Sequence, residues 1–219
     1  IQDHLDGKTT IGTYFIDPRT QTTKTIAWDL DVKLEKPLDK DTWTSLVKDL
    51  KPQANKLLGV IGLHGLDLAA TLVEFSGGKG LHVWLFLDPP IPSILAYALG
   101  RKIAEEAGVK AEVFPKQREL LKPYGNLMKL PFGIHNATNL RSVVYKCVWK
   151  EKKNYEWETI DAAHLSAVQP EFIASEDKRL QELRERLEAQ YRPWMESEVG
   201  RGEPYGGEDP PCVVAYLLG

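Results

Sequence analysis

Apolar and polar residues alternate most clearly over Thr22–Lys33, and this alternation predicts a β-strand. The apolar side chains of its second half fall on one face (Ile26, Trp28, Leu30 and Val32). Asp29 and Asp31 fall together on the other face. Two carboxylates so placed repel one another unless a cation lies between them. The stretch therefore predicts either a metal site or, alternatively, two solvated charges beside a turn.

Other stretches of the chain predict further strands, over residues 9–16, 70–75, 81–87, 111–114, 126–131 and 141–149. We expect the first to pair with Thr22–Lys33 as a hairpin, and Tyr155–Trp157 to complete a hairpin with the last. The run over 81–87 is almost unbroken in apolar residues, which predicts a central strand covered on both faces.

Helix signals lie between these strands. Asp41 is the expected N-cap of a helix that reaches about Leu50, and Pro52 is expected to open a second helix that reaches the 59–65 region. Ser93 is the expected N-cap of a helix to Ala107 that Gly108 ends. A charged helix is expected over 176–191, with a narrow apolar stripe and a solvated outer face.

The composition is that of an ordinary globular protein: 219 residues, 42% hydrophobic, with a formal net charge of −3. No apolar run is long enough to span a membrane, and we expect a cytoplasmic protein because Cys147 and Cys212 lie far apart in the sequence. No Cys/His spacing predicts zinc. The chain starts without Met and stops inside the apolar run 213–219, which we interpret as an excised fragment.

A glycine-rich turn, Ser76-Gly77-Gly78-Lys79-Gly80, separates two of the predicted strands, and His82 follows it. Glycines let backbone N–H groups turn toward an anion, and the hydroxyl, ammonium and imidazole groups add to this, so the turn suits a triphosphate. It differs from a Walker A loop and from a Rossmann fingerprint because a strand, not a helix, follows it. The alternative is a hairpin turn with a structural histidine.

The Asp-x-Asp strand followed by Ser-Gly-Gly-Lys-Gly-x-His-Val resembles the archaeo-eukaryotic primase superfamily, which includes the polymerase domains of bacterial end-joining ligases. Three further stretches extend the resemblance, at residues 4–12, 112–117 and 125–135. The ordered set, over about residues 3–146, is similar to the primase-polymerases of CRISPR-associated and other prokaryotic defence loci.

The resemblance implies an α/β (α+β) fold: a primase-polymerase core with an RRM-like sheet module, an N-terminal α/β module and a C-terminal helix. It implies a catalytic domain over residues 1–195. Residues 196–219 would then be a linker and the beginning of a C-terminal accessory domain.

By the same resemblance, Asp29 and Asp31 would hold two divalent cations, Mn²⁺ or Mg²⁺. The third acid is expected to be Glu112, at a position where the family more often has Asp; Asp88 is the second choice. The nucleotide-binding residues would be Ser76, Lys79, Gly80, His82, Lys129 and His135. Weaker candidates for nucleic-acid contacts are Lys8, Asn126 and Arg141.

Two of these assignments have structural alternatives. A lone lysine among apolar residues, such as Lys129, often only extends its ammonium group to solvent. Tyr14 and Trp84 are expected in the core and not as base-stacking platforms.

The implied function is template-directed, metal-dependent nucleotidyl transfer by a DNA primase-polymerase that starts primers de novo and extends them. Its expected partners are a single-stranded DNA template and primer, dNTPs or NTPs and, through its genomic context, CRISPR adaptation proteins; no membrane is expected. Two alternatives use the same residues or the same fold. One is a repair polymerase that only extends primers, and the other is a non-catalytic RRM-like nucleic-acid-binding module.

Overall fold

The computed structural model describes residues 1–33, 40–120, 124–150 and 154–163, with four isolated positions further on at 182, 185, 186 and 189. The helix expected over 176–191 lies outside the described residues except at those four positions. The linker and accessory-domain segment expected over 196–219 lies wholly outside them. Within the described parts, no helix combines the length and apolar character needed to cross a bilayer.

Eight strands, three α-helices and one 3₁₀ helix lie in the described part of the first 163 residues. In chain order they are α1 (Gln2–Leu5), β1 (Gly12–Tyr14), β2 (Thr22–Asp31), α2 (Lys40–Leu63), the 3₁₀ helix η1 (Leu68–Ala70), β3 (Thr71–Phe75), β4 (Gly80–Pro92), α3 (Ser93–Glu106), β5 (Glu112–Phe114), β6 (Leu127–Lys129), β7 (Val143–Lys150) and β8 (Asn154–Ile160).

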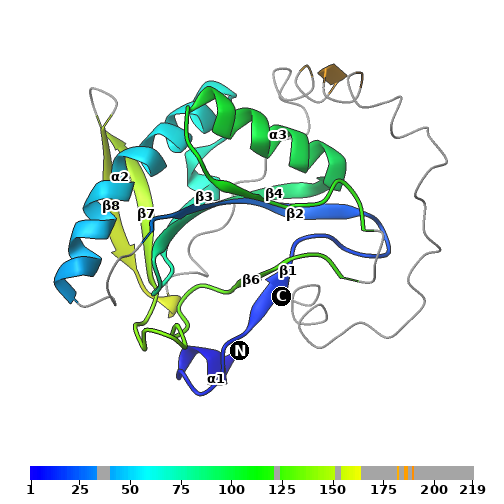
Figure 1. The fold of residues 1–219 in the computed structure, drawn as a ribbon. Helices are drawn as coiled ribbons and strands as arrows, with labels where there is room; N and C mark the ends of the chain where they lie inside the picture. The colour runs from blue at the N-terminus through cyan, green and yellow to red at the C-terminus, as the bar shows by residue number, and fades with distance from the viewer. Residues whose placement is uncertain are drawn as a thin grey trace.

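The main sheet has the strand order β5-β2-β4-β3-β7-β8, and every neighbouring pair is antiparallel (Figure 1). Its first part is a β-α-β-β-α-β unit, β2-α2-β3-β4-α3-β5, in which β2 and β4 lie at the centre. This is the split arrangement of ferredoxin-like and RRM-like modules. The expected α/β fold with an RRM-like sheet is confirmed, as are the central position of β4 and the β7–β8 hairpin.

Two helices, α2 and α3, cover one face of this sheet (Figure 1). The alternation in β2 explains why: Ile26, Trp28 and Leu30 point to that face and are fully buried. The indole N–H of Trp28 donates to the carbonyl of Gly100 in α3 at 2.8 Å, so the largest side chain of β2 also fixes how that helix sits. A close approach of this kind needs a glycine, because a Cβ on residue 100 would lie 2.6 Å from Val113 Cγ1.

On the opposite face lies a small second sheet, in which β1 pairs with β6. A separate apolar cluster joins the two sheets, and it includes Phe15, Ala27, Trp84, Phe114 and Met128. Trp84 is therefore a core residue, as expected, whereas Tyr14 is half-buried and stacks on Tyr124.

The predicted hairpin between residues 9–16 and 22–33 is wrong. Only Gly12–Tyr14 is a strand, and its partner is β6, more than a hundred residues later. A strand has two hydrogen-bonding edges, and β4 and β5 occupy both edges of β2.

Two helix predictions are also wrong in detail. Residues 40–63 form one continuous helix with Pro52 inside it, and Asp41 lies in its first turn instead of capping it. The burial of Leu50, Ala54 and Leu57 on both sides of the proline outweighs the lost backbone hydrogen bond. At α3 the N-cap position is Pro92, and the Ser93 hydroxyl donates to the carbonyl of Arg118 instead of capping the helix.

Candidate active site

A row of polar side chains crosses four strands of the main sheet at one level. The strand register places Glu112 opposite Asp29, Asp29 opposite His82, and His82 opposite Glu74. Directly opposite residues have their Cα atoms about 4.5–5.5 Å apart and share a face of the sheet. The acidic strand and the strand after the glycine-rich turn are therefore neighbours.

Two residues further along β2, the sheet meets the end of the glycine-rich turn. Asp31 lies opposite Gly80, and Lys79 Nζ lies 2.6 Å from Asp31 Oδ2. A Cβ on residue 80 would collide with Asp31 Oδ1 and would lie 2.6 Å from the carbonyl oxygen of Leu30 and 3.3 Å from Asp29 Oδ1. The absence of a side chain at Gly80 thus keeps open the space beside both aspartates.

Asp29 has an unsatisfied carboxylate. Its Oδ1 atom is buried and accepts no hydrogen bond from the described residues, and His82 Nε2 lies 3.7 Å from it. Burial raises the pKa of Asp29 to about 6; the charge of His82 opposes this rise, and the charges of Asp31 and Glu112 add to it. A buried oxygen that lacks a donor and is surrounded by other carboxylates is a site that a cation would satisfy.

His82 is held from behind by a residue that the sequence analysis did not single out. Glu74, in the middle of β3, is fully buried, and its Oε2 lies 3.0 Å from His82 Nδ1. Burial alone would lower the pKa of His82, but Glu74, and then Asp29, raise it above its ordinary value. The sequence did contain one signal for Glu74. It is the single charged residue of the strand Thr71–Phe75, whose other residues are apolar except for Thr71.

Ser76 shapes the turn. Its hydroxyl donates to the carbonyl of Gly80 at 3.1 Å and accepts the N–H of Gly78 at 3.2 Å. Gly77 has φ +77°, a conformation that favours glycine, and a Cβ there would meet the carbonyl of Leu140. His135 lies against this turn, because its Nε2 is 2.9 Å from the position of a Cβ on Gly78.

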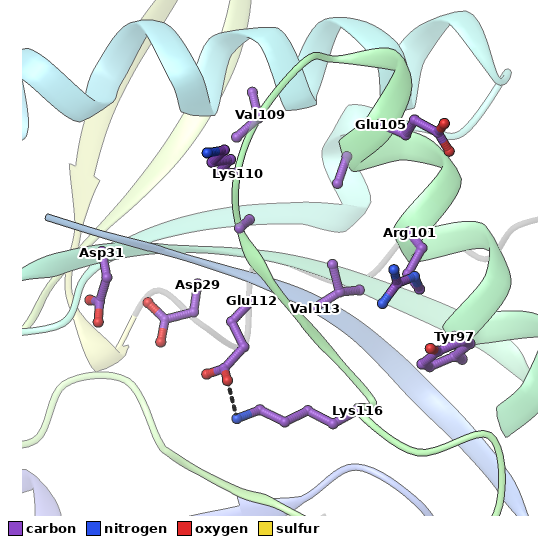
Figure 2. Close-up of a pocket in the computed structure, with 12 residues that line it drawn as sticks. Asp29, Asp31, Tyr97, Arg101, Glu105, Val109, Lys110, Glu112, Val113 and Lys116 are labelled. Atoms are coloured by element: carbon purple, nitrogen blue, oxygen red, sulfur yellow. Dashed lines mark ion pairs between the residues drawn. The ribbon is translucent and has the colours of Figure 1, made fainter.

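A cavity of about 950 Å³ opens beside the acids at the β5 edge of the sheet (Figure 2). Asp29, Asp31 and Glu112 line one part of it, and Figure 2 shows their carboxylates on the same side of the strands. Lys116 pairs with Glu112 there. α3 and the loop after it come close to the acids only because β5 pairs with β2, and the sequence does not show that pairing. The cavity therefore has other charged and aromatic lining residues that the sequence did not indicate. They are Tyr97, Arg101, Glu105 and Lys110.

Comparison with known proteins decides the family. The model of the archaeo-eukaryotic primase (AEP) domain of the TOTE conflict system matches residues 1–170 of the chain. The chain belongs to the AEP family. Among solved structures, the AEP domain of the cyanophage S-2L primase-polymerase matches with 17% identity and a TM-score of 0.33, covering 68% of this chain and 62% of that one. No curated protein matches.

Membership of the AEP superfamily confirms the resemblance drawn from the sequence motifs. It places the chain, at family level, among the AEP primase domains, a group of the nucleotidyltransferase type. The matching family is that of a TOTE conflict system, and the match does not show the CRISPR association that we expected.

The carboxylates of Asp29, Asp31 and Glu112 lie where hard oxygen ligands could hold a divalent cation. Asp29 supplies an unpartnered buried oxygen, and Gly80 leaves space next to it. Within the described ranges, however, no group of three or more His, Cys, Asp or Glu side chains is already placed around one point. Lysines engage two of the acids instead: Lys79 pairs with Asp31, and Lys116 pairs with Glu112.

Asp88, the second choice for the third acid, lies away from this row. It is in the same strand as His82 but six residues further along, which corresponds to about 20 Å. Glu112, directly opposite Asp29, is the acid that the register brings to the site.

Lys129 reaches the row of polar side chains from the second sheet. Its ammonium group donates to Glu74 Oε1 at 3.1 Å and to the carbonyl of Leu130 at 3.0 Å, and its side chain is 13% exposed. Thus it does not extend into solvent. It also contributes, after burial, to the lowered pKa of His135.

The three weaker nucleic-acid candidates already have protein partners. Lys8 pairs with Asp3 and Asp6, and Asn126 accepts a hydrogen bond from Gln117. Arg141 donates to the main-chain carbonyls of Leu5 and Phe132, which ties the loop before β7 to the N-terminal segment.

Proposed function

We propose that the chain is the catalytic domain of a DNA primase-polymerase that performs template-directed, divalent-metal-dependent nucleotidyl transfer. The observation that carries the proposal is the row Glu112–Asp29–His82, which puts a carboxylate cluster directly beside the strand that leaves the glycine-rich turn. Carboxylates suit divalent cations, and the turn suits phosphates. A nucleoside triphosphate needs both, next to each other.

In this proposal Asp29, Asp31 and Glu112 hold two divalent cations, Mn²⁺ or Mg²⁺. Cations bound in such a site supply activation of the attacking 3′-hydroxyl and neutralisation of the leaving pyrophosphate. Asp29 presents the buried oxygen Oδ1, and the pairing of Asp31 with Lys79 shows that cationic groups can reach the same pocket.

The phosphate end of the site is assigned to the glycine-rich turn and the two histidines beside it. Lys79 is exposed and flexible enough to exchange Asp31 for a phosphate oxygen. His82 turns Nε2 toward the acids. Ser76 contributes by holding the turn in shape, so that backbone N–H groups and His135 can face the phosphates. Single-stranded DNA is the template, and dNTPs or NTPs are the substrates, in the cytoplasm.

The test is synthesis on a single-stranded DNA template, without primer, in Mn²⁺ and labelled nucleotides. Wild-type protein should form dinucleotides and longer products, and the Asp29→Ala/Asp31→Ala variant should form none. Asp88→Asn, a carboxylate change away from the row, is the matched control and should keep the activity. If the wild-type protein forms products only on primed templates, it extends primers and does not start them de novo. Synthesis by the double variant would refute the proposal.

A further inference from the structure

Glu74 is a buried carboxylate to which the proposed reaction assigns no role. It has 0% exposure, and three donors converge on it, two from the neighbouring strand β4 and one from β6 in the second sheet. His82 Nδ1 lies 3.0 Å from Oε2, Trp84 Nε1 lies 3.2 Å from the same oxygen, and Lys129 Nζ lies 3.1 Å from Oε1. The other side chains of β3 near it are apolar (Leu72, Val73 and Phe75).

A fold that needed only packing at this position would have an apolar residue there, because burying a carboxylate is unfavourable unless it is fully paired. Both oxygens of Glu74 are paired, with two basic groups and one indole N–H. Burial alone would raise the pKa of Glu74, but His82 and Lys129 together hold it below its ordinary value. The group is therefore a carboxylate, which can only accept hydrogen bonds.

This fixes the hydrogen on His82. Since Glu74 only accepts, the Nδ1 atom of His82 must carry a proton and donate it. The ring then turns Nε2 the other way, toward Asp29 Oδ1 at 3.7 Å. The edge-to-face contact between the rings of His82 and Trp84, with centroids 6.0 Å apart, limits rotation of the imidazole further.

We propose that Glu74 is a positioning residue: it orients His82 so that Nε2 faces the acids and the phosphates of the nucleotide, and it ties this ring to the second sheet through Lys129. The inference rests on the proposed nucleotidyl transfer at the same site. The competing account gives Glu74 one task, neutralising Lys129 between the two sheets. It predicts a loss of stability when Glu74 is changed, with no separate effect on nucleotide binding.

The wild-type protein provides the first test. In a ¹⁵N NMR spectrum of the histidine ring nitrogens, His82 Nδ1 should be protonated, and its hydrogen should exchange slowly with solvent because it is bonded to Glu74. An unprotonated Nδ1 would overturn the proposal. This measurement does not depend on whether any variant folds.

The second test is Glu74→Gln, which keeps the size of the side chain. The single amide oxygen can take the place of Oε2, next to His82, or of Oε1, next to Lys129, but not of both, so the amide NH₂ would face a donor on the other side. We expect dATP and tripolyphosphate to bind ~10–100-fold more weakly, the range for losing a residue that orients a functional histidine. Thr71→Val is the matched control, since it removes a hydrogen bond from the same strand, the one to the carbonyl of Leu68 at 2.7 Å, has no contact with His82, and should keep wild-type affinity.

The outcomes separate the two proposals. If wild-type protein binds no dATP, the proposed function fails, and the role of Glu74 fails with it. If wild-type protein binds dATP and a folded Glu74→Gln variant binds equally tightly, only the role of Glu74 is refuted. Equal losses of binding in Glu74→Gln and Thr71→Val, in proportion to their lower melting temperatures, would favour the purely structural account and overturn the proposal.

Discussion

Replacing Asp29 by Asn should make the metal-free protein more stable while it removes the activity. The ordinary pKa of an aspartate is 3.8, and burial raises that of Asp29 to about 6. Asparagine has nearly the same shape and carries no charge. It therefore removes the unfavourable free energy of holding a buried carboxylate whose Oδ1 atom lacks a donor.

The magnitude follows from the pKa difference. A rise of about two units, at 1.36 kcal/mol per unit, corresponds to about 3 kcal/mol. The folded protein keeps the proton to higher pH than the unfolded chain, so the wild type loses stability as pH rises from 3.8 to about 6, and the full loss is present above pH 6. The advantage of Asp29→Asn should thus be about 3 kcal/mol at pH 7.5 and below about 1 kcal/mol near pH 4.

Urea unfolding of both proteins in EDTA, at pH 7.5 and at pH 4, measures this. Asp49→Asn, an exposed change in α2, is the control and should alter the free energy of unfolding by less than about 0.5 kcal/mol. Adding Mn²⁺ at 100 times its dissociation constant should stabilise the wild type by about 2.7 kcal/mol and Asp29→Asn by less. An Asn variant no more stable than the wild type in EDTA at pH 7.5 would refute the reasoning.

Three further variants test other parts of the site. Gly80→Ala places a methyl group against Asp31 and Leu30, so we expect loss of nucleotide incorporation and a destabilisation of about 1–3 kcal/mol in urea. Gly59→Ala in α2 is its control: the nearest neighbour of a Cβ there is Tyr155 Oη at 3.7 Å, so the change should be neutral or stabilising by about 0.5–1 kcal/mol. Glu112→Gln should weaken Mn²⁺ binding by at least ~10-fold in calorimetry, whereas Asp88→Asn should not; the reverse result would exchange their roles. Lys79→Met should raise the KM for nucleotide but change the free energy of unfolding by less than about 1 kcal/mol, because its pair with Asp31 is exposed; an unchanged KM would remove Lys79 from the phosphate end.

The sequence predicted the parts of the site that depend on strand periodicity and on motif order. Alternation in β2 put Asp29 and Asp31 on one face, and the order of the motifs assigned His82, after the turn, to the same site; the structure places it on the strand next to β2. Both follow from the two-residue repeat of a strand and from contacts between segments with clear patterns.

The parts that were missed depend on contacts between distant segments. The donors to Glu74 come from residues 8, 10 and 55 positions away in the chain, and β1 finds its partner in β6. Periodicity shows which face of a strand is buried, but it does not show which edge is taken. The helix break predicted at Pro52 was wrong for a similar reason. The buried contacts that keep α2 continuous past the proline are made with the sheet beneath it.

Lys129 has a partner in the structure that the sequence did not indicate. The motif placed it at the nucleotide site, and it does reach the row of polar residues. It reaches that row by binding Glu74, behind His82, and not from the open side where a nucleotide would lie. Its contribution to nucleotide binding is therefore expected to act through His82.

The central claim is that the acids beside the glycine-rich turn catalyse nucleotidyl transfer, and incorporation of an α-³²P-labelled nucleotide by Asp29→Asn tests it most directly. A variant that is folded and more stable than the wild type leaves no ambiguity about misfolding. We predict that its rate on a single-stranded DNA template in Mn²⁺ falls by at least ~100-fold. Losing a direct metal ligand should reduce the rate at least as much as losing a residue that only orients a ligand. Incorporation at the wild-type rate would contradict the account.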